Sequence, residues 1–355
     1  MQMLFIIPLL KTGNPYYIIV NILTDNGENT MQNEKTSVLV LAQCDWTMRE
    51  TLNIRFGTQC AFTFAENGEH PTAEQLRAAA VIFGEPSGAQ LAQTENLRLL
   101  QLTWAGADKY TRMENLPRSV VLANASGAFG TIIAEYAIGS LVALYRSFGR
   151  YWSNKQAYIW QKYDHSETIS GKTALVLGMG DIGANVARRL KVFGAAVLGV
   201  KRTAVSAVPE DFEEAHTLDA LDALLPRADI VIGCLPNTRE TAGLLTAERL
   251  HAMKAGAVLV NVGRGSLAGT DDLVSALQDG HLGGAALDVF ETEPLPADCP
   301  LWDMENVLLT PHIAGPSFGG SADVQNTIWH ICMDNLDRYL TGKPLKNVVN
   351  RSEGY

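Results

Sequence analysis

The chain has 355 residues, of which 47% are hydrophobic and 19% are charged. This composition is typical of a globular protein rather than a disordered one, and the length suits two domains of roughly 100–200 residues each. The formal charge of −10 is spread along the chain without a block of Lys or Arg, so we expect no nucleic-acid partner.

Cysteine usage and hydropathy narrow the class of protein further. The five cysteines are scattered and form no C-x-x-C pair, which disfavours a disulfide framework or a zinc site and fits a reducing cytoplasm. No His, Asp and Cys residues show metal-ligand spacing, so no metal is expected. The apolar runs 5–10 and 16–23 are too short to span a bilayer, and we expect no membrane partner.

The first 36 residues precede the first pattern that is typical of a domain. A second methionine, Met31, is followed by polar residues and then by the apolar run Ser37–Ala42. We expect residues 1–36 to be an extension, either disordered or the product of an upstream start, with a strand or partner-binding arm as the alternative.

From residue 37 onward, short aliphatic runs alternate with helical patterns, which predicts a parallel α/β architecture. In the first part, one helical segment is expected at 72–80 and strands at 37–42, 79–83, 97–103 and 120–123. One long helix is expected from Phe129 to about Gly149, because residues 133, 137, 141 and 144 form a single apolar stripe.

A second run of strands and helices begins at Gly171. Its helices are expected at 184–193 and, as the last helix of the chain, at 323–340. Its strands are expected at 173–177, 195–200, 230–235, 257–262, 284–288 and 307–310.

The hexapeptide Gly178-Met-Gly-Asp-Ile-Gly183 indicates a dinucleotide site because of its context. It follows a predicted strand directly and opens a predicted helix. Gly178 allows the tight turn, Gly180 lets a pyrophosphate approach the backbone, and Gly183 lets helix and strand pack closely. The free N–H groups at the helix start attract phosphate. Asp181 and Ile182 belong to the same predicted cofactor-binding loop.

The residues after the next strand bear on the choice between NAD and NADP. That strand ends in Lys201, Arg202 and Thr203, with no carboxylate to bind a ribose 2′-hydroxyl. A guanidinium is the natural bidentate partner of a phosphate, so NADP is favoured over NAD. The alternative, that Lys201 and Arg202 are solvated surface charges, stays open.

Three residues that follow predicted strands form a candidate catalytic set: Arg264, Glu293 and His312. Arg264 can bind a carboxylate bidentately and polarise a carbonyl. His312 is the side chain best suited to donating a proton at pH 7, and a hydrogen bond from its imidazole to Glu293 would fix the tautomer and stabilise the imidazolium. Glu291, two residues earlier, is the alternative partner for the histidine.

Four segments together resemble the D-isomer-specific 2-hydroxyacid dehydrogenases, and the resemblance extends from about residue 37 to 349. The segments are 171–183, 261–265, 288–294 and 311–315. The resemblance implies that Arg264 anchors the substrate, that His312 is the acid/base and that Glu293 is its partner. It also implies that Asp288 orients the nicotinamide carboxamide, and that a homodimer forms through the nucleotide-binding domain and the helix after Phe129.

The resemblance assigns further binding residues by position. The loop 234–238, with Leu235 and Pro236, lines the cofactor cleft, and Val262 belongs to the same cofactor set. Backbone N–H groups of Ala105 and Gly106 bind the substrate carboxylate. Trp104 departs from the usual smaller residue and is expected to reshape the substrate pocket. The glycine-rich segment 315–320 also departs from the commonest pattern.

The fold class expected is α/β, with a Rossmann dinucleotide-binding domain at 141–315 inserted in a smaller flavodoxin-like βα substrate domain. The substrate domain comprises 37–140 and 316–355. The function expected is hydride transfer between NAD(P)H and a small 2-oxo acid. Glyoxylate or hydroxypyruvate, pyruvate-like or longer 2-oxo acids, and 3-phosphoglycerate all remain open, the last disfavoured because little chain follows the final helix. The alternative function is a dinucleotide-sensing, corepressor-like scaffold, whereas a formate-type dehydrogenase would have Gln in place of Glu293.

Overall fold

The computed structural model describes residues 6–9, 16–19, 35–65, 70–164 and 166–355. Contacts divide the chain into two compact units, Met1–Lys35 and Thr36–Tyr355. In the first unit, β1 (Ile6–Leu9) and β2 (Tyr16–Ile19) form an antiparallel pair. The expectation of an extension over 1–36 stays a prediction, because most of that segment lies outside the described residues.

The second unit contains a five-stranded sheet in which every pair of neighbours is parallel, in the order β4-β3-β5-β6-β7. Its strands are β3 (Thr36–Val40), β4 (Cys60–Phe64), β5 (Val81–Phe83), β6 (Leu99–Gln101) and β7 (Val121–Ala123). The connecting helices are α1 (Trp46–Phe56), α2 (Ala73–Ala78), α3 (Gly88–Leu91) and α4 (Asp108–Thr111). Parallel strands need such crossovers, and here they cover a sheet whose strands β5 and β6 are buried at every residue.

A seven-stranded sheet, also parallel between all neighbours, follows in the order β10-β9-β8-β11-β12-β13-β14. Its strands are β8 (Thr173–Leu177), β9 (Ala196–Lys201), β10 (Glu214–Thr217), β11 (Ile230–Gly233), β12 (Ala257–Asn261), β13 (Leu282–Leu287) and β14 (Val307–Leu309). Its helices are α7 (Asp181–Val192), α8 (Leu221–Leu224), α9 (Ala247–Ala252) and α10 (Thr270–Gln278). Short 3-10 helices lie at Leu218–Ala220, Leu225–Arg227, Gly265–Leu267 and Pro300–Asp303.

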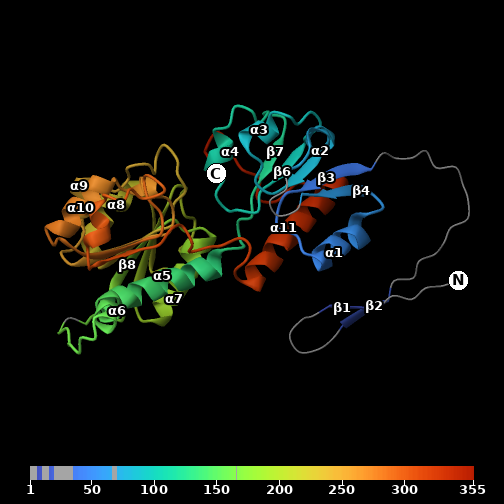
Figure 1. The fold of residues 1–355 in the computed structure, drawn as a ribbon. Coiled ribbons are helices and arrows are strands. Elements are labelled where there is room, and N and C mark those ends of the chain that lie inside the picture. The colour runs from blue at the N-terminus through green and yellow to red at the C-terminus, as the bar shows by residue number, and fades with distance from the viewer. Residues whose placement is uncertain (1–5, 10–15, 20–34, 66–69, 165) are drawn as a thin grey trace, which may run out of the picture. The chain divides into compact units, whose positions relative to one another are not determined.

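The last helix, α11 (Ala322–Leu340), returns to the five-stranded sheet (Figure 1). Its buried face belongs to the same apolar cluster as β3 and β5, and the ring of Trp329 lies edge-on to that of Phe83, 6.4 Å away. Segments more than 200 residues apart in sequence therefore build one layer. The α/β class with a Rossmann-type sheet is confirmed.

The long helix expected from Phe129 to about Gly149 is observed as α5 (Gly130–Tyr145), and a separate helix, α6 (Phe148–Gln156), follows, so that expectation is wrong only beyond Tyr145. The break is at Ser147, whose φ of 52° is left-handed and cannot continue a right-handed helix. The apolar stripe of α5 is buried as expected at Ile133, Ala137 and Leu141. In Figure 1, α5 runs beside α7, and the two helices contact each other extensively.

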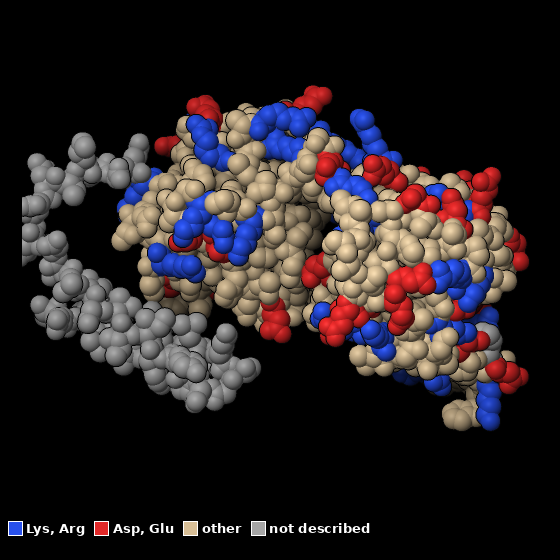
Figure 2. All heavy atoms as spheres, turned by 180° about the vertical axis from the view of Figure 1, so that it is seen from behind, with Lys and Arg blue, Asp and Glu red and all other residues tan. Residues whose placement is uncertain are grey.

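The surface carries both signs of charge. On the face shown in Figure 2, Lys and Arg side chains are interspersed with Asp and Glu. Over the described part of the chain, no helix is both long enough and apolar enough to cross a bilayer.

Candidate active site

Arg264, Glu293 and His312 lie in the loops that follow three neighbouring strands, β12, β13 and β14. Because adjacent parallel strands end at the same edge of a sheet, residues separated by 48 positions in sequence meet there. All three side chains line one cavity of about 690 Å³.

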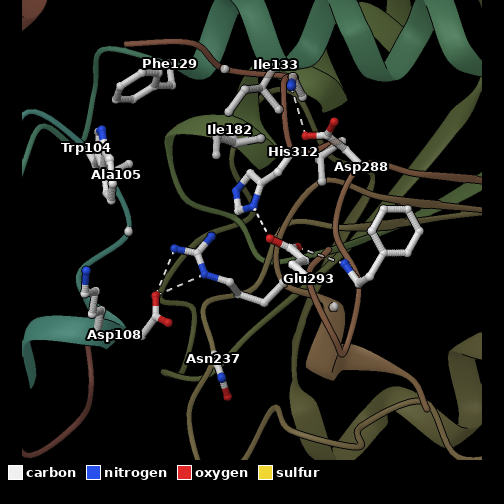
Figure 3. A pocket seen from close by; sticks show the side chains of 18 of the residues that line it. Trp104, Ala105, Asp108, Phe129, Ile133, Ile182, Asn237, Asp288, Glu293 and His312 are labelled. Atoms are coloured by element: carbon white, nitrogen blue, oxygen red, sulfur yellow. Dashed lines mark hydrogen bonds and ion pairs between the residues drawn. The ribbon is translucent and has the colours of Figure 1, made fainter. Parts of the chain in front are cut away.

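His312 and Glu293 form a hydrogen-bonded pair. The distance from Nδ1 of the imidazole to Oε2 of the carboxylate is 2.9 Å, and both side chains are partly exposed. Figure 3 shows the imidazole lying between this carboxylate and Ile182. Because a carboxylate can only accept, Nδ1 carries a hydrogen and donates the hydrogen bond to Glu293. The other ring nitrogen, Nε2, is then the atom left for a reactant.

The backbone of His312 is held in an uncommon conformation by Asp288. The φ of His312 is 56°, in the left-handed region. The buried carboxylate of Asp288 accepts hydrogen bonds from the backbone N–H groups of Ile313 (2.8 Å) and Ala314 (2.9 Å), and the Asp288 carbonyl accepts one from His312 N (2.8 Å). Asp288 therefore fixes the loop that presents the imidazole.

A polar chain from α5 reaches the same loop. The hydroxyl of Thr310 donates to Asp288 Oδ1 at 2.6 Å, so the hydroxyl of Tyr136, 2.5 Å from Thr310 Oγ1, is the donor in that second contact. Burial raises the pKa of Tyr136, which keeps the phenol protonated for this role.

Arg264 reaches across the cavity to Asp108 of α4. Its Nε and Nη2 atoms both donate to Asp108 Oδ1, at 3.1 and 3.0 Å, and its Nη1 donates to the Gly263 carbonyl at 2.8 Å. The side-chain amide of Asn261 also fixes the backbone of this loop, because it donates to the Arg264 carbonyl at 2.9 Å. Three hydrogen bonds to two acceptors, Asp108 Oδ1 and the Gly263 carbonyl oxygen, thus orient the guanidinium.

The loop with Trp104, Ala105 and Gly106 forms the facing wall of the cavity. A Cβ atom placed on Gly106 would lie 1.7 Å from Nη2 of Arg264, so only glycine allows this approach. Among the described residues, none accepts a hydrogen bond from the backbone N–H of Ala105 or Gly106. The side chain of Trp104 is 46% exposed and lies at the cavity wall (Figure 3).

The start of this loop is held by the carboxylate of Glu85. The carboxylate accepts from Thr103 N at 2.7 Å and from Thr103 Oγ1 at 2.9 Å. Burial raises the pKa of Glu85, while the hydrogen bonds from Thr103 oppose that shift.

A second cavity of about 610 Å³ adjoins the first and is lined by the glycine loop. Gly178 has a φ of 104°, and a Cβ on Gly183 would lie 1.8 Å from the Gly178 carbonyl oxygen, so both glycines are required by the backbone itself. A Cβ on Gly180 would meet no atom within 4 Å. This open space at the start of α7 is the cradle that a pyrophosphate needs, so the residues present fit a dinucleotide.

Most of the other predicted cofactor residues line this second cavity: Ile182, Lys201, Arg202, Thr203, Leu235, Pro236 and Val262. Asp288 lines only the first cavity, and Asp181 and Gly183 lie outside the lining of both. Asp181 turns toward the amide of Asn185, 3.2 Å away, and toward the start of α5.

Sequence reasoning missed Asp108, Tyr136 and the segment 350–355. Each forms a hydrogen bond with a residue more than 150 positions away in sequence, and no local motif marks such a pairing. Glu291, the alternative partner for the histidine, accepts a hydrogen bond from Thr270 N at 3.2 Å, whereas Glu293 contacts His312. Within the described ranges, no group of three or more His, Cys, Asp or Glu side chains is placed to hold a metal ion.

Comparison with known proteins identifies the family. The profile of the D-isomer specific 2-hydroxyacid dehydrogenase NAD-binding domain matches residues 138–314. A glyoxylate reductase of Thermofilum pendens is 32% identical over 264 residues, covering 72% of this chain and 76% of the relative.

Solved structures agree with this result. A D-isomer specific 2-hydroxyacid dehydrogenase family protein of Aeromonas salmonicida matches with a TM-score of 0.79 and 34% identity, covering 90% of this chain and all of that one. An NADPH-dependent glyoxylate/hydroxypyruvate reductase of Sinorhizobium meliloti, solved with NADP and sulfate, matches with a TM-score of 0.75 and 26% identity over 90% of this chain and all of that one. The chain belongs to the D-isomer specific 2-hydroxyacid dehydrogenase family.

Proposed function

We propose that this enzyme reduces a small 2-oxo acid to the D-2-hydroxy acid, with Arg264, Glu293 and His312 as the catalytic residues and NADP(H) preferred to NAD(H). The observation that carries the proposal is the meeting of these three side chains in one cavity beside the glycine-loop cavity. The cofactor domain would comprise 141–315 and the substrate domain 37–140 with 316–355.

Each residue has a defined task in this reaction. The free backbone N–H groups of Ala105 and Gly106 and the guanidinium of Arg264 bind the substrate carboxylate, and Arg264 polarises the carbonyl. Bound reduced nicotinamide supplies the hydride to the carbonyl carbon. His312 Nε2 gives its proton to the carbonyl oxygen, and Glu293 keeps the imidazole oriented while its charge changes.

The cofactor would lie along the second cavity. The glycine loop with Gly178, Gly180, Asp181, Ile182 and Gly183 would hold the pyrophosphate, and Leu235, Pro236 and Val262 would contact the rest of the dinucleotide. Lys201, Arg202 and Thr203 stand at the end of β9 with no carboxylate among them, which favours a 2′-phosphate. Asp288 would orient the nicotinamide carboxamide through the loop it holds.

The shape of the first cavity favours a small substrate. Trp104 occupies one wall, and Phe129 and Ile133 form an apolar wall opposite the catalytic pair (Figure 3). A bulky 2-oxo acid would clash with these side chains, so we infer that the substrate is glyoxylate or hydroxypyruvate. A relative whose name is glyoxylate reductase supports this choice.

We further propose that the enzyme is a cytoplasmic homodimer. The five cysteines, all of which lie in the described part of the chain, form no disulfide. Large apolar side chains gather on α6 and the segment after it and are exposed, with Trp152 at 63% and Trp160 at 100%. Such exposed aromatic groups favour a subunit interface.

Steady-state oxidation of NADPH and of NADH, followed at 340 nm with a panel of 2-oxo acids, tests the reaction. The proposal predicts turnover that is fastest with the smallest acids and with NADPH. Binding of both dinucleotides without turnover on any acid would instead favour a nucleotide-sensing scaffold.

A further inference from the structure

The side chain of Arg202 is occupied in this structure. Its Nη2 atom lies 2.6 Å from Oε2 of Glu353, and its guanidinium carbon lies 4.9 Å from the centre of the Tyr355 ring. Both contacts come from the segment Asn350–Tyr355, and Gly354 and Tyr355 line the same cavity as Arg202. The residue best suited to binding a 2′-phosphate is therefore held by an anion of the chain itself.

The segment that provides Glu353 is firmly folded. The Asn350 carbonyl accepts hydrogen bonds from Glu353 N at 3.1 Å and Gly354 N at 2.9 Å, and Asn350 N donates to the Tyr355 carbonyl at 3.0 Å. These bonds close a tight turn, with Gly354 at a φ of 90°. The carboxylate is thus presented by a defined turn rather than by an extended tail.

This turn is anchored on the five-stranded sheet. The guanidinium of Arg351 donates to the carbonyls of Leu116, Pro117 and Val120, at distances from 2.6 to 3.1 Å. Val349 N bonds to the Leu122 carbonyl in β7 at 2.8 Å. Arg202 follows β9 of the other sheet, so the contact between Arg202 and Glu353 joins the two sheets across the cofactor cavity.

Charge decides what this contact does to a dinucleotide. A 2′-phosphate carries about −1.5 to −2 charges near neutral pH and would compete with the carboxylate for the same guanidinium. NADH has a hydroxyl at that position and needs no such exchange. The carboxylate should therefore weaken binding of the phosphorylated cofactor selectively.

We propose that Glu353, together with Tyr355, is a specificity-determining element of the cofactor site that clamps Arg202 and reduces its preference for NADP(H). The inference rests on the proposed dinucleotide site. The residues at the end of β9 favour NADPH over NADH, and this preference should be smaller while Glu353 holds Arg202 than it would be with Arg202 released.

Equilibrium titration of the full chain with NADPH and with NADH tests this element. Glu353→Gln keeps the size of the side chain and removes its charge, and we expect it to tighten NADPH about fivefold, the upper range for an exposed ion pair. The dissociation constant for NADH should stay close to the wild-type value. In an Arg202→Ala background, Glu353→Gln should no longer change NADPH binding.

Glu240→Gln is the matched control, because Glu240 also acts electrostatically on Arg202 but makes no hydrogen bond to it. Its effect should be clearly smaller than that of Glu353→Gln. An equal effect of the two variants, an unchanged ratio of NADPH to NADH affinity in Glu353→Gln, or an effect that persists without Arg202 would overturn the inference alone. Failure of the wild-type protein to bind either dinucleotide would overturn the proposed function and this inference with it.

Discussion

Two carboxylates two residues apart have different tasks near the histidine. Glu293 contacts His312 Nδ1 at 2.9 Å, whereas Glu291 accepts from the backbone of Thr270. In the proposed reaction only the first can orient the imidazole and stabilise its charged form.

The pair Glu293→Gln and Glu291→Gln tests that difference. Glu293→Gln should lower kcat by about tenfold to a hundredfold, because the neutral amide no longer stabilises the imidazolium. Glu291→Gln should have nearly the wild-type kcat. Equal losses in the two variants, measured by steady-state NADPH oxidation, would contradict the assignment.

The position of Arg264 depends on a residue without a side chain. A methyl group on Gly106 would overlap Nη2 of Arg264, so Gly106→Ala must displace the guanidinium. Because a displacement of about 1 Å at a reacting group can cost about a hundredfold in rate, kcat/KM should fall by that order.

Gly88→Ala serves as the control for Gly106→Ala. A Cβ on Gly88 meets nothing nearer than 3.8 Å, and this residue lies in α3, away from the cavity. Both variants should show the circular dichroism of the wild type. Full activity in Gly106→Ala would show that the guanidinium is not a fixed part of the site.

Arg264, Glu293 and His312, the proposed catalytic residues, could be selected from the sequence because each follows a strand and belongs to a local motif. The residues that hold the predicted site residues in place could not be selected in this way. Asp108 pairs with Arg264 across 156 positions, and Glu353 pairs with Arg202 across 151. Such contacts depend on how two sheets meet, which no periodicity within one segment can reveal.

At the scale of elements, the glycine loop and α7 combine two separate requirements. Gly183 is needed for packing of α7 against its own loop, whereas Gly180 borders open space. Gly183→Ala should therefore lower the free energy of unfolding by about 1–3 kcal/mol, the usual cost of overpacking.

Gly180→Ala should behave in the opposite way. The protein should unfold at the wild-type temperature but bind NADPH at least about tenfold more weakly, because a methyl group would occupy the place of the pyrophosphate. Thermal unfolding without nucleotide and a titration with NADPH measure the two effects. Loss of stability in both variants, with unchanged affinity in Gly180→Ala, would refute this division.

Glu85 links the stability of the loop that begins at Thr103 to pH. Burial raises the pKa of Glu85 above its usual value of 4.5 in the folded state. Between that value and the raised one, the unfolded chain binds fewer protons than the folded chain, so the stability contribution is present at low pH and is lost as pH rises.

Glu85→Gln removes this titration. The unfolding free energy of the wild type relative to Glu85→Gln should fall as pH is raised from about 4.5 toward neutrality, as measured by urea unfolding at several pH values. A difference that stays constant or grows with pH would contradict a raised pKa for Glu85.

Element prediction from sequence succeeded where hydrophobic periodicity was strong and failed where backbone geometry decided. The strand before the glycine loop, Thr173–Leu177, was predicted with its observed bounds. The stretch after Phe129 keeps its helical composition through residue 149, but Ser147 adopts a left-handed conformation that its residue type does not signal. Helix α1 and strands β4 and β10 were missed. In β10, for example, all four residues of Glu214–Thr217 are half-buried, so no alternation of buried and exposed residues marks the strand.

At the scale of the molecule, two parallel sheets meet around two adjoining cavities. Two ion pairs, Arg264 with Asp108 and Arg202 with Glu353, join loops that follow strands of the seven-stranded sheet to segments packed on the five-stranded sheet. The sequence predicted the α/β class and the resemblance predicted the family, both confirmed. Only the structure shows which loops of the two sheets face each other across the cavities.

The proposed reaction depends on proton transfer by His312 to a substrate held beside the dinucleotide. The most direct test is a single turnover of protein-bound NADPH mixed with hydroxypyruvate, followed at 340 nm, in the wild type and in His312→Ala. We predict conversion to the D-hydroxy acid in the wild type and a rate at least about a hundredfold lower in His312→Ala, with NADPH still bound. Equal rates in the two proteins, or no conversion by a wild type that binds NADPH, would contradict the account.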